Sequence, residues 1–256
     1  METDKDVLLS TIDEEGVLIL TLNRANKHNA LNTELTQKLL DAIRGSEHDE
    51  RVRALVLVGA QPSFCAGADT TEFNALTPQD PKAVLARADL TTALHLSFSQ
   101  LSKPVVAAVT GNALGGGAGL ALACDMVVMA EKARLGYPEL KHGIVAAVVL
   151  ANLVRQLGPK NAFELVALGE PIGGLEAEKL GLVNRVTALE DTLPEAIKIA
   201  KQLASWSPIA MATTKRTFYR AMDLSLASAL DVGRDANVMM RGFKRVDPLK
   251  SNPSEH

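Results

Sequence analysis

The chain has 256 residues, of which 47% are hydrophobic and 22% are charged, and its formal net charge is −3. This balance allows one large domain or two modest ones around a sizeable core, and the weak negative charge does not favour a nucleic-acid partner. The two cysteines, Cys65 and Cys124, provide no disulfide framework. With no signal-peptide pattern and no apolar run of membrane-spanning length, we expect a cytoplasmic protein with no membrane partner.

The first part of the chain predicts two strands around a capped helix. The β-rich run 17–22 and the continuous apolar run 54–58 are typical of strands, and the second is typical of a strand buried on both faces. Between them, Asn32 or Thr33 is expected to cap a helix. The apolar positions of that helix are Leu35, Leu39, Leu40 and Ile43.

The segments beside the centre of the chain also predict regular structure. The polar, proline-containing segment 70–81 is expected to be mobile, and a long helix should follow it over 82–101. In this helix His95 has no partner at helical spacing, so we expect it to pack in the interior. Further strands are expected at 126–130 and 182–186, and further helices at 146–157, 161–168, 175–180, 194–204, 209–219 and 224–240.

The centre of the chain predicts a strand, a glycine-rich turn and the start of a helix. The apolar run 104–109 leads to three consecutive glycines, Gly115 to Gly117, and the small-residue segment 118–124 should form the helix. Bare N–H groups at a helix N-terminus stabilise negative charge. A dinucleotide fingerprint is excluded because its third glycine would fall at Leu120, and no Gly-Lys-Ser/Thr follows for a P-loop. The turn therefore serves a single oxyanion, such as a polarised carbonyl, or tight helix packing.

Four segments resemble the crotonase (enoyl-CoA hydratase/isomerase) superfamily in their order and spacing. They are RANKHNALN at 24–32, FCAGAD at 64–69, the glycine-rich stretch 106–126, and YPELKHGI at 137–144. The resemblance, which extends over about 16–186, implies an α/β spiral of repeated ββα units with a helical C-terminal region that builds homotrimers or homohexamers. We accordingly divide the chain into an acyl-CoA-binding core, 1–192, and an oligomerisation region, 193–256.

The resemblance also implies a set of catalytic residues. The backbone N–H groups of Ala68 and Gly116 would form an oxyanion hole that binds a thioester oxygen and stabilises an enolate. Glu139, which follows Pro138, matches the position of a catalytic glutamate in the family. Burial in an apolar acyl pocket would raise the pKa of Glu139 and suit it to proton transfer.

Five further residues are expected to contact coenzyme A, which enters as part of the substrate, so that no separate cofactor is needed. Basic residues in the first loop of the family lie near the CoA phosphates, and the adenine lies near the FCAGAD loop. Asp69 is expected to fix its loop as an Asx residue rather than to catalyse. No metal site is expected among the five histidines. The proposed substrate-binding residues are Lys27, Ala30, Ala66, Asp69 and Thr70.

The chain departs from the family pattern at three positions. Hydratases of this family carry two glutamates, and the first of these positions is Gly119 here. Two carboxylates hold and activate a water, whereas one carboxylate is sufficient to move a proton between two carbons. The segment 146–150 is bulkier than in many relatives, and Ala147 replaces the Asp that serves dienoyl-CoA isomerases. The tail 239–250 resembles the family tail only loosely, which makes Lys244 and Arg245 poor candidates for phosphate contacts across subunits.

These departures favour a shift of a double bond between the β,γ and α,β positions of an enoyl-CoA, with Glu139 as the single acid and base. A hydratase or hydratase-lyase with a rearranged site is the first alternative, and a non-catalytic acyl-CoA-binding protein is the second. A serine hydrolase is disfavoured because the chain has no G-x-S-x-G elbow. If the site otherwise resembles a hydratase, Gly119→Glu is expected to create or increase water addition. The acyl chain and the choice between trimer and hexamer stay open.

Overall fold

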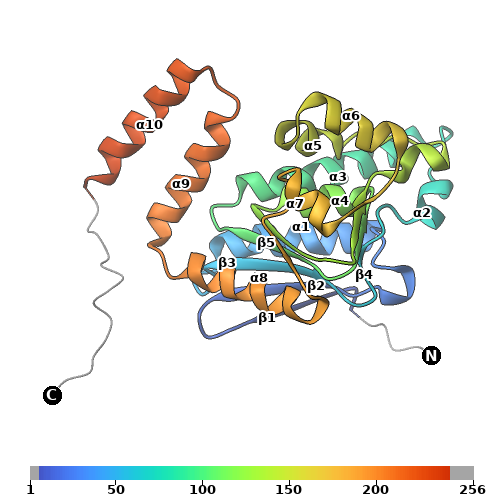
Figure 1. Cartoon of the computed structure of the whole chain (residues 1–256), viewed down its shortest axis with the longest axis horizontal. Helices are drawn as coiled ribbons and strands as arrows, with labels where there is room; N and C mark the ends of the chain where they lie inside the picture. The colour runs from blue at the N-terminus through green and yellow to red at the C-terminus, as the bar shows by residue number, and fades with distance from the viewer. Residues whose placement is uncertain (1–5, 243–256) are drawn as a thin grey trace.

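The computed structural model describes residues 6–242, an α/β fold with two sheets and surrounding helices (Figure 1). Lys244 and Arg245 lie outside the described residues. The strands are β1 (Leu8–Ile12), β2 (Val17–Leu22), β3 (Ala54–Gly59), β4 (Ser63–Cys65), β5 (Val105–Val109), β6 (Asn112–Leu114), β7 (Met126–Ala130), β8 (Arg134–Gly136), β9 (Ile172–Gly173) and β10 (Arg185–Thr187). The helices are η1 (Ala25–Lys27), α1 (Thr33–His48), α2 (Thr70–Ala75), α3 (Pro81–Gln100), α4 (Gly116–Ala123), η2 (Pro138–His142), α5 (Leu150–Gln156), α6 (Pro159–Leu168), α7 (Gly174–Lys179), α8 (Leu189–Ala204), α9 (Pro208–Ala221) and α10 (Leu226–Met240).

Three successive pairs of strands, β3–β4, β5–β6 and β7–β8, each place one strand in each of the two sheets. The six-stranded sheet has the order β1-β2-β3-β5-β7-β10, and the four-stranded sheet has the order β4-β6-β8-β9. β3, β5 and β7 are parallel neighbours in the first sheet, and β4, β6 and β8, which follow them, are parallel neighbours in the second. Each strand pair with its following helices therefore advances one position in both sheets. This is the predicted spiral of ββα units, although the sequence itself shows no repeat.

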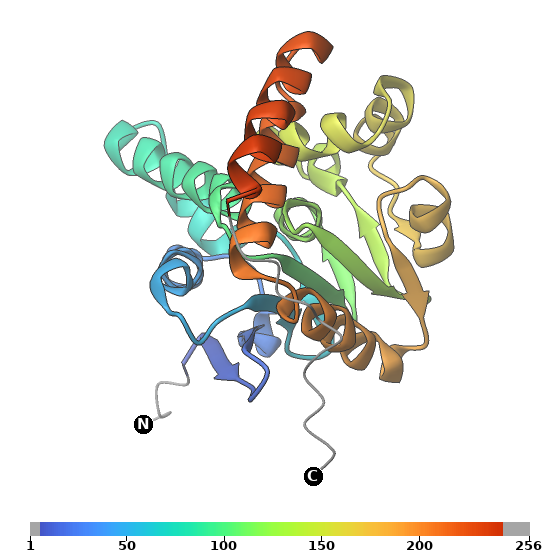
Figure 2. The ribbon, with the colours of Figure 1, turned by 90° about the vertical axis from the view of Figure 1, so that its left-hand side faces the viewer.

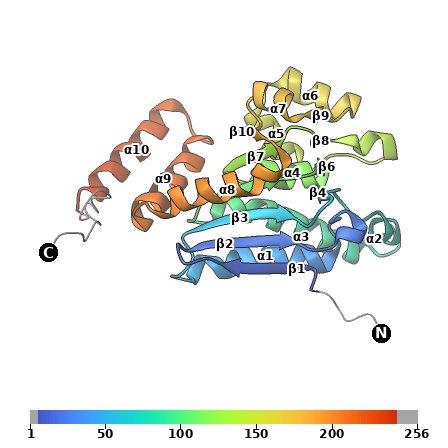
Figure 3. The ribbon, with the colours of Figure 1, turned by 60° about the horizontal axis from the view of Figure 1, so that its bottom comes forward.

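The central strands of the six-stranded sheet are buried on both faces, and β3 shows how their side chains divide. Ala54, Val56 and Val58 pack in one apolar cluster with α8. Leu55 and Leu57 belong to the larger cluster that contains the buried faces of α1, α3 and α4. Figure 3 shows β1, β2 and β3 side by side, with α1 and α8 near them. Burial on both faces explains why this strand is a continuous apolar run.

Helix α8 covers the sheet with a stripe of small residues. Ala196, Ala200 and Ala204 recur every four positions and are buried, and the helix packs against β3, β5 and β7. Small side chains at this spacing let a helix lie close to a sheet. The helix begins at Leu189, so the predicted division after residue 192 falls inside it.

Helices α9 and α10 form a hairpin that projects from the rest of the molecule (Figures 1 and 2). A partly buried polar cluster attaches α9 to the core: Lys215 Nζ lies 2.6 Å from Asp125 Oδ2, and Tyr219 Oη donates to Asp125 Oδ1 at 2.8 Å. Asp125 Oδ2 also accepts the N–H of Val105 at 2.7 Å. We call Asp125, Lys215 and Tyr219 the arm anchor. The hairpin exposes large apolar side chains at Phe218, Leu226, Leu230, Val238 and Met239.

Two predicted segments differ from the structure. The segment 70–81, for which no helix was predicted, begins with helix α2, because Asp69 caps it by accepting the N–H of Thr71 at 3.0 Å. The predicted helix 146–157 is shorter, since α5 begins only at Leu150 and the preceding residues form a turn. An apolar run alone does not distinguish a turn from a helix. In the part of the chain described, no helix combines the length and hydrophobicity needed to cross a membrane.

Candidate functional site

Two loops that are far apart in the sequence are bonded to each other beside the N-terminus of α4. Leu31 and Ala68 pair as an isolated parallel bridge. The N–H of Leu31 donates to the carbonyl of Gly67 at 2.7 Å, and the N–H of Asp69 donates to the carbonyl of Leu31 at 3.2 Å. These bonds join the first loop, 24–32, to the FCAGAD loop, 64–69, so the structure brings together the two segments that were expected to share one ligand.

Two arginines that the sequence reasoning missed hold these loops in place. Arg24 donates to the Asp69 carboxylate at 2.8 Å and to the carbonyl of Ala30. Arg87, on α3, donates to the carbonyl of Leu31 at 2.9 Å. Arg24 lies within a segment that resembles the family, but nothing in the spacing of the chain identifies a partner 45 residues away.

Asp69 fixes its loop, as expected for an Asx residue. Its carboxylate accepts the N–H groups of Thr71 and Glu72 and forms an ion pair with Arg24, while its side chain is largely buried. Burial acts to raise the pKa of Asp69, but the hydrogen bonds from Arg24, Thr71 and Glu72 together hold it below its usual value. Asp69 is therefore ionised at neutral pH and is occupied by bonds within the protein.

The three consecutive glycines have different structural tasks. Gly115 has φ +53, which favours glycine, and it precedes the first residue of α4. A Cβ atom on Gly117 would lie 2.0 Å from the carbonyl oxygen of Cys65, so that position requires glycine for close packing. Gly116 is half-exposed between them, and a Cβ atom on it would lie 3.7 Å from the amide nitrogen of Ala68. The two amides predicted to form an oxyanion hole are therefore neighbours at the N-terminus of α4.

Glu139 lies against this helix terminus from η2, which begins at Pro138. Its Oε1 is 2.8 Å from the position that a Cβ atom on Gly115 would occupy. Its Oε2 is buried and has no hydrogen-bond partner within residues 6–242, and the same holds for the hydroxyl of fully buried Tyr137. Burial raises the pKa of Glu139, while its own backbone N–H and the charge of His142 act in the opposite direction. The site thus holds a carboxylate that accepts a proton more readily than an exposed glutamate does.

The position of the second hydratase carboxylate is occupied by other side chains. A Cβ atom on Gly119 would lie 2.3 Å from Val149 Cγ1 and 3.1 Å from His95 Cε1. His95 is buried, as predicted, and burial lowers its pKa to about 4. An acidic side chain at residue 119 therefore requires Val149 to move, and no pattern in the sequence predicts this contact.

The residues predicted to contact coenzyme A lie on or beside the joined loops. Lys27 is exposed at the end of η1, and Ala30 is buried next to the bridge residue Leu31. Ala66 and Thr70 are exposed at the two ends of the turn that contains Ala68 and Asp69. This arrangement leaves an accessible surface beside the Ala68 amide.

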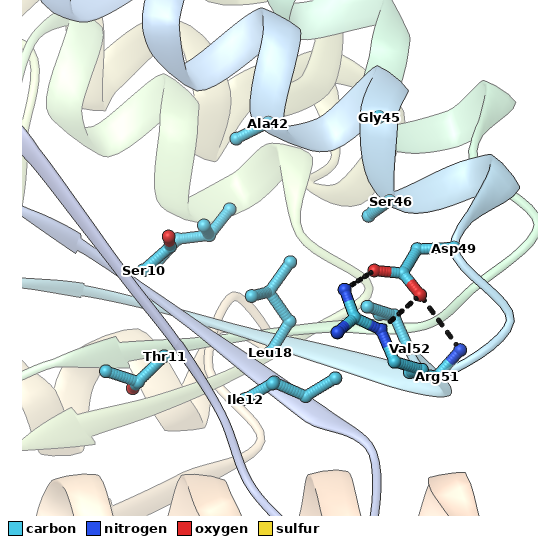
Figure 4. Close-up of a pocket in the computed structure, with 11 residues that line it drawn as sticks. Ser10, Thr11, Ile12, Leu18, Ala42, Gly45, Ser46, Asp49, Arg51 and Val52 are labelled. Atoms are coloured by element: carbon cyan, nitrogen blue, oxygen red, sulfur yellow. Dashed lines mark hydrogen bonds and ion pairs between the residues drawn. The ribbon is translucent and has the colours of Figure 1, made fainter.

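Two pockets elsewhere contain none of the predicted site residues. One, of about 300 Å³, lies between β1, β2 and the end of α1, where Arg51 and Asp49 form an ion pair with 2.7 Å between Nη2 and Oδ2 (Figure 4). The other, of about 360 Å³, lies between α9 and α10. Within residues 6–242, we find no cluster of three or more His, Cys, Asp or Glu side chains that could coordinate a metal ion.

Comparisons with known proteins identify the class to which this fold and site belong. The family description "Enoyl-CoA hydratase/isomerase" matches residues 13–244, so the chain belongs to this family, and the predicted crotonase resemblance is confirmed. The probable mitochondrial enoyl-CoA hydratase of Dictyostelium discoideum is 35% identical over 228 residues, which cover 88% of this chain and 80% of that protein. The 2,3-dehydroadipyl-CoA hydratase of Escherichia coli is 35% identical over 218 residues, which cover 85% and 84%.

The fold is confirmed by a solved structure. The crystal structure of enoyl-CoA hydratase from Mycobacterium smegmatis aligns with a TM-score of 0.87 and 32% sequence identity, over 92% of this chain and 91% of that chain. These three proteins are named hydratases. The chain is thus an enzyme of the enoyl-CoA hydratase/isomerase family, and its reaction has to be argued from its own residues.

Proposed function

We propose that this protein binds an acyl-CoA thioester and moves a double bond of the acyl chain between the β,γ and α,β positions. The observation that carries the proposal is that a carboxylate is present at one of two neighbouring positions and absent from the other. Glu139 is a half-buried carboxylate with one unpartnered oxygen in the described chain, whereas Gly119 has no side chain and Val149 fills its place. One carboxylate is sufficient to move a proton but not to hold a water in the way that two do.

The reaction follows from the positions of the two amides and the carboxylate. The thioester oxygen accepts the N–H groups of Ala68 and Gly116, next to the positive end of the α4 dipole. Ionised Glu139 takes a proton from C2, and the electrons of that C–H bond form an enolate conjugated with the C3–C4 double bond. The enolate oxygen then restores the thioester carbonyl, the C1–C2 π electrons form the C2–C3 double bond, and the π electrons of the former C3–C4 double bond take the proton back from Glu139 at C4.

Burial of Glu139 supports this role in both steps. A general base transfers protons best when its pKa lies near the working pH, and burial moves the pKa of Glu139 in that direction. The raised pKa makes the carboxylate a stronger base for the first step, and the protonated carboxyl group then keeps the proton beside the substrate until it is returned at C4. One group with a raised pKa therefore serves as both base and acid.

Hydration is the second candidate, and the names of the relatives favour it. Proteins 35% identical to this chain over most of its length are named hydratases. For this reaction, a group other than residue 119 has to hold the attacking water. A non-catalytic acyl-CoA-binding protein is the third reading, and it gives no reason for a buried carboxylate next to the two amides.

The proposal extends to ligand contacts, assembly and location. Lys27 would lie near the CoA phosphates, and Ala30, Ala66, Asp69 and Thr70 would shape the surface for the adenine end. We expect a homotrimer or homohexamer built through the 193–256 region, because α9 and α10 expose large apolar side chains that a single chain leaves uncovered. Light scattering at micromolar concentration checks this assembly, and a monomer would refute it.

We also propose a cytoplasmic location, because the two cysteines are free and buried.

The decisive experiment incubates the protein with paired β,γ- and α,β-enoyl-CoAs and identifies the products by mass and retention time. We expect interconversion without gain of water. Glu139→Gln keeps the shape of the side chain but cannot accept a proton, so turnover should fall by about a hundred- to ten-thousand-fold. Acyl-CoA affinity, measured by calorimetry, should change little.

The matched control is Glu178→Gln, at an exposed position on α7. Efficient hydration of crotonyl-CoA by the unmodified protein would show that the preferred reaction is wrong. Retained turnover in Glu139→Gln would remove the proton-transfer mechanism altogether. An absence of any heat or thermal shift with saturating acyl-CoA would remove the ligand class as well.

A further inference from the structure

Helix α4 meets two polar side chains at consecutive turns. Glu139 Oε1 lies 2.8 Å from the Cβ position of Gly115, and His95 Cε1 lies 3.1 Å from the Cβ position of Gly119. The N–H of Gly119 donates to the carbonyl of Gly115 at 3.0 Å, so the two positions are one helical turn apart, about 5.4 Å along the axis. The imidazole therefore lies beside the same helix as the proposed base, one turn further from its N-terminus.

His95 has no hydrogen-bonding function inside the described chain. Both ring nitrogens are buried, and neither has a partner in residues 6–242. Its neighbours on the inner side of α3 are Leu94 and Phe98, both fully buried, and the hydroxyl of Ser97 donates to the carbonyl of Leu94 instead. A buried polar atom without a partner reduces stability, so an unpaired imidazole in an otherwise apolar wall indicates a partner that is absent from the chain itself.

We propose that His95 is a specificity-determining residue of the acyl site and forms a hydrogen bond with a keto or hydroxyl oxygen on the acyl chain. This inference rests on the proposed function, because that function places the thioester at Gly116 and C2 at Glu139. A helical turn corresponds to roughly three or four bonds of an acyl chain, so the oxygen belongs on C4 or C5. The substrate is thus an oxygenated acyl-CoA rather than a plain hydrocarbon one.

A hydrogen-bonding role fits His95 better than a proton-transfer role. Burial lowers its pKa to about 4 and no charged group acts on it, so the ring is neutral at neutral pH. A neutral imidazole offers one donor and one acceptor, which suits a keto or a hydroxyl oxygen. No group in the described chain is bonded to either nitrogen, so none relays a proton to or from the ring.

Val149 controls access to the imidazole. Its Cγ1 and the imidazole Cε1 both approach the Cβ position of Gly119, so the valine side chain lies beside the ring. Val149 belongs to the irregular segment 144–149, which follows Gly143 at φ +68 and precedes α5. The proposed contact therefore requires the Val149 side chain to rotate away from the ring.

Saturated acyl-CoA pairs of nearly equal shape test the inference without turnover. We would compare 5-oxohexanoyl-CoA with 5-methylhexanoyl-CoA, and 4-oxohexanoyl-CoA with 4-methylhexanoyl-CoA, by calorimetry at pH 7. The keto compound of at least one pair should bind roughly two- to tenfold more tightly to the unmodified protein, as expected for one buried hydrogen bond. His95→Leu should abolish this preference, and His95→Gln, which retains a donor and an acceptor, should keep it.

The control variant is His48→Gln, at an exposed position at the end of α1, which should leave the preference unchanged. Equal affinities within both pairs on the unmodified protein overturn the role of His95 and leave the proposed function standing, since acyl-CoA still binds. A preference that survives in His95→Leu also overturns it, and His95→Phe provides a second apolar replacement if the leucine variant does not fold. If no compound binds, the proposed function fails and this inference fails with it.

Discussion

The first and second turns of α4 are built from the same small residues but have opposite surroundings. At the first turn, Gly116 is half-exposed and its amide lies near that of Ala68, with Glu139 beside them. At the second turn, Gly119 is buried, and Val149 occupies the space that a side chain would need. Glycine thus leaves the turn at Gly116 open and lets a neighbouring side chain close the turn at Gly119. The role of a glycine in a motif therefore depends on which side chains of other segments lie next to it.

Among the tests of this comparison, the largest effect is expected at the open turn. Gly116→Pro removes one N–H donor at the first position of a helix, where proline is well tolerated, so the fold should be retained. Loss of one oxyanion-hole donor typically reduces turnover by about a hundred- to a thousand-fold. The rate is measured on the best enoyl-CoA of the panel, with circular dichroism as the check on folding. A folded variant with nearly full turnover would exclude Gly116 from the mechanism.

The closed turn is tested by adding the missing carboxylate. Because a Cβ atom on Gly119 would lie 2.3 Å from Val149 Cγ1, Gly119→Glu alone should destabilise the fold, by about 1–3 kcal/mol from overpacking and more from the buried charge. It should not by itself create hydration, which revises the expectation drawn from the sequence.

The double variant Gly119→Glu with Val149→Ala provides the space and should recover part of the stability. Any gain in water addition to crotonyl-CoA should appear in this variant, with Val149→Ala as its control. Efficient hydration by the single variant would show that Val149 does not close this turn.

The buried imidazole should make stability depend on pH. Since burial lowers the pKa of His95 from 6.5 to about 4, the unfolded chain takes up a proton before the folded one does. The stabilising contribution is complete above pH 6.5 and is lost as the pH falls towards 4, a loss of roughly 3 kcal/mol. Urea denaturation at several pH values should show this fall in the unmodified protein and in His48→Gln. An equally steep fall in His95→Gln would contradict the assignment.

The smallest expected effect is a change in stability that depends on Glu139, the carboxylate beside the open turn. The raised pKa of Glu139 means that the folded protein holds this proton more tightly than the unfolded chain. The resulting stabilisation is complete below the ordinary glutamate pKa of 4.5 and is lost as the pH rises through the raised value. Glu139→Gln should therefore be slightly more stable than the unmodified protein at neutral pH, and kcat/KM should fall on the acid side at a pH above 4.5. Equal melting temperatures at neutral pH would contradict this.

Much of the fold and the open turn could be predicted from the sequence, because the signals are local. The cap at Asn32, the apolar runs that become β3, β5 and β7, and the three glycines before α4 each depend on neighbouring residues. The family segments added the correct pairing of the FCAGAD loop with the glycine turn.

The closed turn could not be predicted, because it depends on contacts between distant residues. Val149 reaches Gly119 from 30 positions away, and nothing in the apolar run that contains it indicates that its side chain replaces a carboxylate. The same limit applies to Arg87, which supports the first loop from α3 through the carbonyl of Leu31. His95 was correctly expected in the interior, but its lack of any partner became visible only once α4 was placed against it.

The arm anchor, Asp125, Lys215 and Tyr219, has a consequence for how the protein unfolds. Lys215 and Tyr219 are held against Asp125, which also accepts the N–H of Val105 at the start of a central strand. Neutralising Lys215 while the arm stays in place would leave a largely buried carboxylate without its counter-charge, a change that typically costs about 3–5 kcal/mol. Although the hairpin projects from the molecule, it is therefore not a detachable appendage. The core and the arm should melt as one cooperative unit, and a chain shortened before Pro208 should lose stability in the sheet itself.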